Sequence, residues 1–185
     1  MADHEHLIEQ EIATQPIYTG KIFRVERMTV RLPNGRETLR EIVRHNGAAC
    51  VIAVDDQQRV ALVRQYRAAI GRVTLEVPAG KLDHPGEDAY GCAVRELREE
   101  TGLKASQVRY LTTIVTAIGF CDEKVSIYLA TGLSQDEACP DEDEFVDVSW
   151  MPLDELCRQV MAGQIADAKT ALAALMAQTL LRARQ

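Results

Sequence analysis

Three glutamates stand close together in one short stretch of the chain. Glu96, Glu99 and Glu100 are spaced i, i+3 and i+4, so in a helix their carboxylates share one face. Like charges at this spacing repel one another, and a divalent cation would turn that repulsion into binding. Carboxylate oxygens are hard ligands that suit Mg²⁺ or Mn²⁺. The alternative is a solvated acidic face that pairs with Arg95 and Arg98.

The residues around these glutamates decide between the two interpretations. A pattern runs from Gly80 through Glu87 to Arg95-Glu96-Leu97-Arg98-Glu99-Glu100-Thr101-Gly102-Leu103. It resembles the Nudix box, whose fixed positions are all matched from Glu87 to Leu103. Six residues separate Gly80 from Glu87 where the family pattern has five, and a turn should absorb one inserted residue locally. The resemblance implies a Nudix hydrolase, an enzyme that cleaves nucleoside diphosphates linked to another moiety with the help of a divalent metal.

The resemblance also implies a role for each matched residue. The implied metal ligands are Glu96, Glu99, Glu100 and the backbone carbonyl of Ala79. Arg95 would hold the glutamates in place by ion pairing, and both Glu99 and Arg95 would serve catalysis. Glu87 would brace the loop before the helix, where a carboxylate is also stabilised by the helix dipole. The expected cofactor is Mg²⁺, with Mn²⁺ as the alternative.

A wider resemblance to the ADP-ribose pyrophosphatase group extends over most of the chain. The segments that carry it are Val63–Arg67, Leu75–Asp83, Gly119–Lys124, Asp141–Phe145 and Ile165–Thr170. In that group an acidic loop before a late strand supplies the catalytic base and a further metal contact. The resemblance therefore implies Glu142 as base and Glu144 as metal ligand, or the reverse.

Five side chains are candidates for contact with the substrate. Arg67 follows an expected strand and precedes the box, so its guanidinium could bind a diphosphate through two hydrogen bonds. A plain surface arginine is the alternative for Arg67, and more so for Arg64. The full set of candidates is Arg67, Arg64, Glu123, Tyr18 and Arg44.

The resemblance favours hydrolysis of ADP-ribose to AMP and ribose 5-phosphate, but two alternatives stay open. Ala117-Ile118-Gly119-Phe120 replaces the Ser-Pro-Gly-Phe that is common in the group, so another nucleoside diphosphate sugar such as GDP-mannose fits the same fold. The second alternative is a non-catalytic Nudix-like binding module. Such a module should have lost part of Arg-Glu-x-x-Glu-Glu, which is intact here from Arg95 to Glu100.

Strand and helix patterns predict an α/β (α+β) unit with a mixed β-sheet between helices, which is also the Nudix fold. Apolar or alternating runs predict strands, and 3.6-residue periodicity predicts helices. Strands are expected at 48–54, 60–66, 73–77, 108–117, 124–132 and 145–151, and helices at 87–101, 153–161 and 167–181. Gly102 should end the first helix as its C-cap.

The N-terminal part reads as a separate piece. Residues 1–15 are polar with weak helical character, which Pro16 should end. Residues 17–44 predict an antiparallel β-meander with a hairpin turn at Pro33-Asn34-Gly35-Arg36. We expect domains at 1–45 and 46–185. The first should take part in a homodimer, as the resemblance implies and as its small size suggests.

Composition limits the partners and the compartment. The 185 residues carry 21 Lys+Arg and 28 Asp+Glu, a formal charge of −7, which disfavours nucleic-acid polymers. No apolar run approaches the roughly 20 residues of a membrane helix, and the N-terminus lacks the pattern of a signal peptide. The five cysteines are scattered and predict neither disulfides nor a zinc site. A cytoplasmic protein without a membrane partner is expected.

Overall fold

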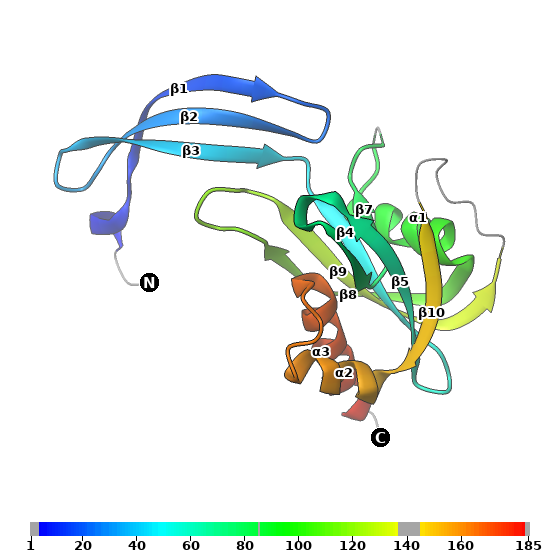
Figure 1. Ribbon diagram of the computed structural model, residues 1–185. Helices are drawn as coiled ribbons and strands as arrows, with labels where there is room; N and C mark the ends of the chain where they lie inside the picture. The colour runs from blue at the N-terminus through cyan, green and yellow to red at the C-terminus, as the bar shows by residue number, and fades with distance from the viewer. Residues whose placement is uncertain (1–3, 85, 137–144, 184–185) are drawn as a thin grey trace. The chain divides into compact units, whose positions relative to one another are not determined.

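The computed structural model describes residues 4–84, 86–136 and 145–183. Two compact units divide the chain, one formed by Met1–Asn46 with Val115–Lys124 and one by Gly47–Ile114 with Val125–Gln185. Figure 1 labels the elements of both units, and each unit is described separately below.

The first unit contains a three-stranded antiparallel sheet in the order β1-β2-β3 (Figure 1). Its strands are β1 (Gln10–Thr19), β2 (Phe23–Arg31) and β3 (Glu37–His45). The turn between β2 and β3 closes with a hydrogen bond from Leu32 N to Arg36 O at 2.8 Å, and Gly35 adopts a φ of 82°. The predicted antiparallel meander and its hairpin turn are therefore confirmed.

The prediction for residues 1–15 is wrong in its main element. Only Glu5–Leu7 is helical, as one short 3₁₀ turn, and Pro16 lies inside strand β1 instead of ending a helix. A proline is tolerated there because β1 is an edge strand and its pairing with β2 shifts register between Pro16 and Tyr18. Every residue of β1 is exposed. Because neither face of the strand is buried, its sequence needs no alternation of apolar and polar residues, and the usual sign of a strand is missing.

The segment Val115–Lys124 belongs to the first unit although it is far away in sequence. Val43 N donates to Phe120 O at 2.7 Å, and Asp122 N donates to Val43 O at 3.1 Å. These bonds extend β3 sideways through a bridge between Val43 and Cys121. The expected piece 1–45 omitted this segment.

The second unit is built on a mixed sheet, as predicted. Among the described residues, β4 (Ala48–Val54) runs parallel to β9 (Lys124–Gln135) and antiparallel to β5 (Arg59–Arg67) and β7 (Ala79–Lys81). The remaining strands are β6 (Arg72–Glu76), β8 (Leu103–Val115) and β10 (Val146–Pro152), and the order along the main path is β10-β5-β4-β9-β8. The three-residue strand β7 was not predicted.

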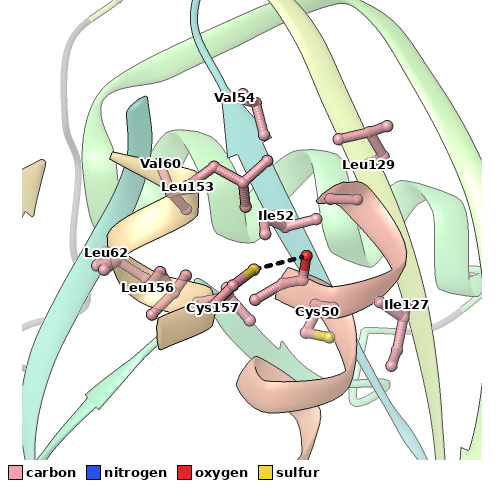
Figure 2. Packing of buried hydrophobic residues seen from close by; sticks show 14 of the residues in the cluster. Cys50, Ile52, Val54, Val60, Leu62, Ile127, Leu129, Leu153, Leu156 and Cys157 are labelled. Atoms are coloured by element: carbon pink, nitrogen blue, oxygen red, sulfur yellow. Dashed lines mark hydrogen bonds between the residues drawn. The ribbon is translucent and has the colours of Figure 1, made fainter. Parts of the chain in front are cut away.

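Helices cover both faces of this sheet, because β4 alternates two apolar sets. Ala49, Val51 and Ala53 pack with Leu97 of α1 (Ala89–Thr101). Cys50, Ile52 and Val54 pack instead against α2 (Leu153–Met161) and α3 (Ala168–Arg182), as Figure 2 shows. A period of two in a strand sends neighbouring side chains to opposite faces, which is why one short strand can serve two cores.

A capping residue marks each end of helix α1. Asp88 caps its N-terminus by accepting a hydrogen bond from Gly91 N at 2.8 Å, so the helix begins two residues later than predicted. Gly102 closes it in the left-handed conformation with φ 66°, as predicted. The bounds of α1 fix the register of the glutamates along it.

Candidate active site

Helix α1 turns two of its three glutamates into the protein. Glu96 and Glu100 are only 6% and 3% exposed, whereas the side chain of Glu99 is 26% exposed. Buried carboxylates need partners or cations, since an isolated buried charge is costly. The alternative of a solvated acidic face is wrong for Glu96 and Glu100.

The short strand β7 lies directly against these two carboxylates. Ala79 N donates a hydrogen bond to Glu100 Oε2 at 3.1 Å. A Cβ atom on Gly80 would lie 1.6 Å from Glu96 Oε1, so only glycine leaves room for that side chain. The glycine that opens the sequence motif therefore provides the space for the Glu96 carboxylate.

Arg95 binds three glutamates at once, and these four residues are called the Arg95 cluster. Its Nε and Nη2 donate to the two oxygens of Glu87 at 2.8 and 3.0 Å. Its Nη1 donates to Glu96 Oε1 and to Glu99 Oε2, both at 2.7 Å. The hydrogen bond from Arg95 lowers the pKa of Glu87, and the same bond raises the pKa of Arg95. Glu87 and Arg95 therefore stay charged at neutral pH.

Arg98 does not belong to this cluster. Its Nε pairs with Asp136 at 3.0 Å, and Lys104 pairs with the same carboxylate oxygen at 2.9 Å. Of the two arginines that flank the glutamates in sequence, Arg95 pairs with Glu96 and Glu99, whereas Arg98 pairs with Asp136.

Beneath β7 lies a buried thiol. Cys92 is 0% exposed, and its Sγ lies 3.5 Å from both Gly80 O and Lys81 O. Burial raises the pKa of this thiol to about 12. The thiol is therefore neutral and packs α1 against β7.

The donor set of α1 fits a hard divalent cation. Glu96, Glu99 and Glu100 offer carboxylate oxygens, the ligand type that Mg²⁺ and Mn²⁺ prefer. Gly80 keeps the space around Glu96 open. Within residues 4–84, 86–136 and 145–183, no three acidic, histidine or cysteine side chains converge as a ready ligand set. In the arrangement seen here, Arg95 supplies the positive charge to Glu96 and Glu99.

A second ionic group, which the sequence did not reveal as a site, joins β5, β6 and α3. Glu76 accepts two hydrogen bonds from Arg67, both at 2.7 Å, and a third from Lys169. Lys169 also donates to Asp167 at 3.0 Å. Burial acts to raise the pKa of Glu76, but the Arg67 hydrogen bonds and the Lys169 charge outweigh it and lower that pKa to about 2. These four residues are called the Arg67 cluster.

The remaining substrate candidates are divided between the two units. Arg64 lies in the second unit, where its Nη1 donates to Ser149 Oγ at 3.1 Å. Tyr18 and Arg44 lie in the first unit: Tyr18 is 54% exposed beside Phe23, and Arg44 pairs with Glu26 at 2.8 Å and with Asp122 at 3.2 Å.

Glu123 also belongs to the first unit, and its carboxylate has two neighbours there. Its Oε2 accepts a hydrogen bond from Thr116 Oγ1 at 2.6 Å, and its Oε1 lies 3.6 Å from His45 Nδ1. The expected base Glu142 and ligand Glu144 lie outside the described residues.

This arrangement of α1, β7 and the mixed sheet defines a class of protein. Residues 43–174 match the NUDIX domain model, so the chain belongs to the NUDIX domain family, and it is a Nudix hydrolase. A crystal structure of an ADP compounds hydrolase shares the fold, with a TM-score of 0.83 over 95% of both chains at 23% identity. The predicted family and fold are confirmed.

Curated relatives point to one group within the family. The chain is 41% identical to an ADP-ribose pyrophosphatase of Bacillus subtilis, over 90% of this chain and 91% of that protein. It is 42% identical to an ADP-ribose pyrophosphatase of Mycobacterium tuberculosis, over 89% and 79% respectively. A methanol dehydrogenase activator of Bacillus methanolicus is also 42% identical, over 89% and 90%. The predicted resemblance to the ADP-ribose pyrophosphatase group is thereby confirmed.

No helix in the described part of the chain combines the length and the apolar character that crossing a membrane requires.

Proposed function

We propose that this Nudix hydrolase cleaves ADP-ribose to AMP and ribose 5-phosphate with the help of a divalent cation, Mg²⁺ or Mn²⁺. The observation that carries the proposal is the burial of Glu96 and Glu100 against the backbone of Ala79 and Gly80. The two ADP-ribose pyrophosphatases at 41–42% identity support the choice of substrate.

The cation would be held by Glu96, Glu99, Glu100 and the carbonyl of Ala79. When bound, it supplies the positive charge that neutralises the diphosphate and the charge developing on it. Arg95 keeps the carboxylates oriented through its three ion pairs. These side chains are thus already in position before the substrate binds, so little free energy is needed to reorganise the site during the reaction.

Hydrolysis then requires a nucleophile and a base. Water attacks one phosphorus, a new P–O bond forms, and the bridging P–O bond breaks to release AMP and ribose 5-phosphate. Glu142 accepts the proton of the attacking water in this proposal, and Glu144 is a further cation ligand, with the reverse assignment as its variant. Arg67 and Arg64 are the proposed diphosphate contacts, and Tyr18, Arg44 and Glu123 the proposed contacts with the rest of the substrate.

A substrate panel tests the proposal. ADP-ribose and GDP-mannose should be assayed with Mg²⁺ and with Mn²⁺, with wild type compared to Glu96→Gln and Glu100→Gln. We expect each variant to lose about 100-fold or more in kcat on ADP-ribose, because each removes a charge at the reacting site. The matched control is Glu155→Gln, which alters a half-buried carboxylate of α2 that pairs with Arg158.

Two outcomes would contradict it. Full turnover in EDTA would show that hydrolysis needs no divalent cation. A higher kcat/KM on GDP-mannose than on ADP-ribose would show that GDP-mannose is the preferred substrate. If purified wild type cleaves none of these compounds, the non-catalytic binding module becomes the better description.

We also propose that the chain forms a homodimer through its first unit and acts in the cytoplasm. Apolar side chains on β1 support the dimer, since Ile12, Ile17 and Tyr18 are 42%, 49% and 54% exposed. Light scattering on the purified protein should give twice the mass of 20.6 kDa. Ile12→Lys with Ile17→Lys should yield the monomer, and cell fractionation tests the compartment.

A further inference from the structure

Glu76 is a carboxylate whose hydrogen-bonding capacity is fully used. It is 2% exposed and accepts from Arg67 Nε and Nη2, from Thr74 Oγ1 and from Lys169 Nζ. A carboxylate offers about four acceptor positions, so these four donors saturate it. Glu76 therefore holds the Arg67 guanidinium in one orientation.

Arg67 is bound on one edge only. Its Nε and Nη2 face Glu76, and no described residue accepts a hydrogen bond from its Nη1. Its side chain is 41% exposed, against 3% for Glu76. The hydrogen bonds to Glu76 raise the pKa of Arg67, and the charge of Glu100 contributes to that rise. Arg67 thus offers one charged donor group to solvent, within electrostatic range of a candidate cation ligand.

A carboxylate that fixes an arginine also cancels its charge, and Lys169 counters that effect. Lys169 lies between Glu76 and Asp167, with its side chain only 15% exposed. Burial acts to lower the pKa of Lys169, but Asp167 and Glu76 outweigh it and raise that pKa, so the ammonium group stays charged. Glu76 consequently shares its negative charge between two cations.

Asp167 restores neutrality at the far end of the cluster. It caps α3 by accepting from Thr170 N at 3.1 Å, where the positive end of the helix dipole offsets part of its charge. Asp167 binds Lys169 directly, whereas the cluster shows no direct bond between Asp167 and Arg67 among the described residues. The cluster is therefore neutral as a whole, with its positive end at the exposed Arg67.

We propose that Lys169 is a positioning residue for substrate binding: it balances Glu76, so that Glu76 orients Arg67 while Arg67 Nη1 and its charge remain available to the diphosphate of a nucleoside diphosphate. This inference rests on the proposed function, because it takes a diphosphate as the ligand. It adds a buried lysine that does not itself touch the substrate.

The test compares Lys169→Met with the charge-conserving Lys169→Arg. In Lys169→Met, Glu76 acts on Arg67 alone, so we expect the KM for ADP-ribose to rise about tenfold, the effect of weakening one charged hydrogen bond. The inhibition constant of the uncleavable α,β-methylene analogue should rise equally, and kcat should change less than about threefold. Lys169→Arg should recover most of the loss. Lys104→Met, which removes an exposed lysine paired with Asp136, is the matched control.

A double-mutant cycle separates positioning from a general loss of structure. If Lys169 acts through Arg67, then Lys169→Met should add less than about twofold to the inhibition constant in an Arg67→Ala background. A full tenfold addition would overturn the inference. Circular dichroism must first show that each variant folds; if Lys169→Met does not, Lys169→Gln against Lys169→Arg carries the same comparison.

The outcomes also distinguish this inference from the proposed function. Wild type that neither cleaves ADP-ribose nor is inhibited by its analogue would refute the proposed function. Wild type that does both, with an unchanged KM and inhibition constant in Lys169→Met, would refute only the role of Lys169. A fall in kcat alone would also refute it, since that result would place Lys169 in the chemical step.

Discussion

The Arg95 cluster and the Arg67 cluster use the same kinds of side chain in different proportions. The first sets one arginine against Glu87, Glu96 and Glu99, a formal charge of 1 − 3 = −2. The second sets two cations against two carboxylates, a formal charge of 2 − 2 = 0, with the exposed arginine at one end. A surplus of carboxylate oxygens suits a metal cation, whereas a neutral cluster ending in an arginine suits a phosphate. Under the proposed function, this difference would let a chain of net charge −7 receive an anionic substrate.

The largest expected effect comes from closing the space beside the Arg95 cluster. In Gly80→Ala the new Cβ would meet Glu96 Oε1 at 1.6 Å and displace that carboxylate. A shift of about 1 Å in a catalytic group can cost about 100-fold, so we expect kcat to fall by that factor. Steady-state kinetics with saturating Mg²⁺ measures it.

The matched control for this change is Gly91→Ala on the same helix. Its Cβ would come within 3.3 Å of Asp88 Oδ1, the movable end of a side chain, so little should change. Equal kcat in Gly80→Ala and wild type would show that Glu96 does not need its observed position.

The next effect is a pH dependence of stability that belongs to the Arg67 cluster. Folding lowers the pKa of Glu76 from 4.5 to about 2, so its ion pairs stabilise the fold above pH 4.5 and are lost as the pH falls toward 2. The shift corresponds to about 3 kcal/mol. Glu76→Gln should therefore reduce the free energy of unfolding by about this amount at pH 6, and the difference from wild type should shrink toward pH 2.

Urea unfolding of both proteins between pH 2 and 6 checks this prediction. Glu155→Gln is a suitable control because it removes a half-buried carboxylate that pairs within α2, outside both clusters. A difference that stayed constant over the whole pH range would show that Glu76 contributes through shape and not through charge.

A smaller loss of stability should follow the removal of Arg95. Its side chain is 19% exposed and pairs with three glutamates, so Arg95→Met leaves three carboxylates without it. We expect a loss of about 2 kcal/mol in the free energy of unfolding. Added Mg²⁺ should raise the melting temperature more in Arg95→Met than in wild type, since a cation can replace the lost charge. An equal shift in both proteins would show that the cation does not replace the charge of Arg95, and no shift in either would contradict the cation site.

The smallest effect is expected for Arg98→Met, one turn along the same helix. Arg98 is 54% exposed and pairs with Asp136, outside both clusters. Exposed pairs contribute roughly 0–1 kcal/mol, so stability and kcat should both stay close to wild type. A loss of unfolding free energy as large as that of Arg95→Met would show that Arg98 also belongs to the Arg95 cluster.

Much of the second unit could be predicted because its patterns are local. The strand Ala48–Val54 and the helix Leu153–Met161 have the predicted bounds, since continuous apolar residues and helical periodicity mark them. The glutamate face of α1 was predictable for the same reason. The three residues of β7 are too few to show the two-residue period of a strand. All ten residues of β1 are exposed, so its sequence does not alternate between apolar and polar residues either.

The Arg67 cluster could not be predicted from local patterns. Glu76 and Lys169 are 93 residues apart, and only the packing of α3 beside β6 brings them together. Each residue alone reads as an ordinary surface charge, because Glu and Lys are mostly exposed in proteins. The segment Ile165–Thr170 resembled the family, and that resemblance was the one signal that could have directed attention to Lys169.

The thiol beneath β7 makes the opening of the candidate site measurable. Cys92 contacts the carbonyls of Gly80 and Lys81 and is fully buried, so a thiol reagent can reach it only when α1 and β7 separate. Its labelling rate would thus report how often that separation occurs. A cation bound by Glu96 and Glu100 would join the two elements and slow the labelling in proportion to its affinity. Cys92 could then follow occupancy of the site without any substrate present.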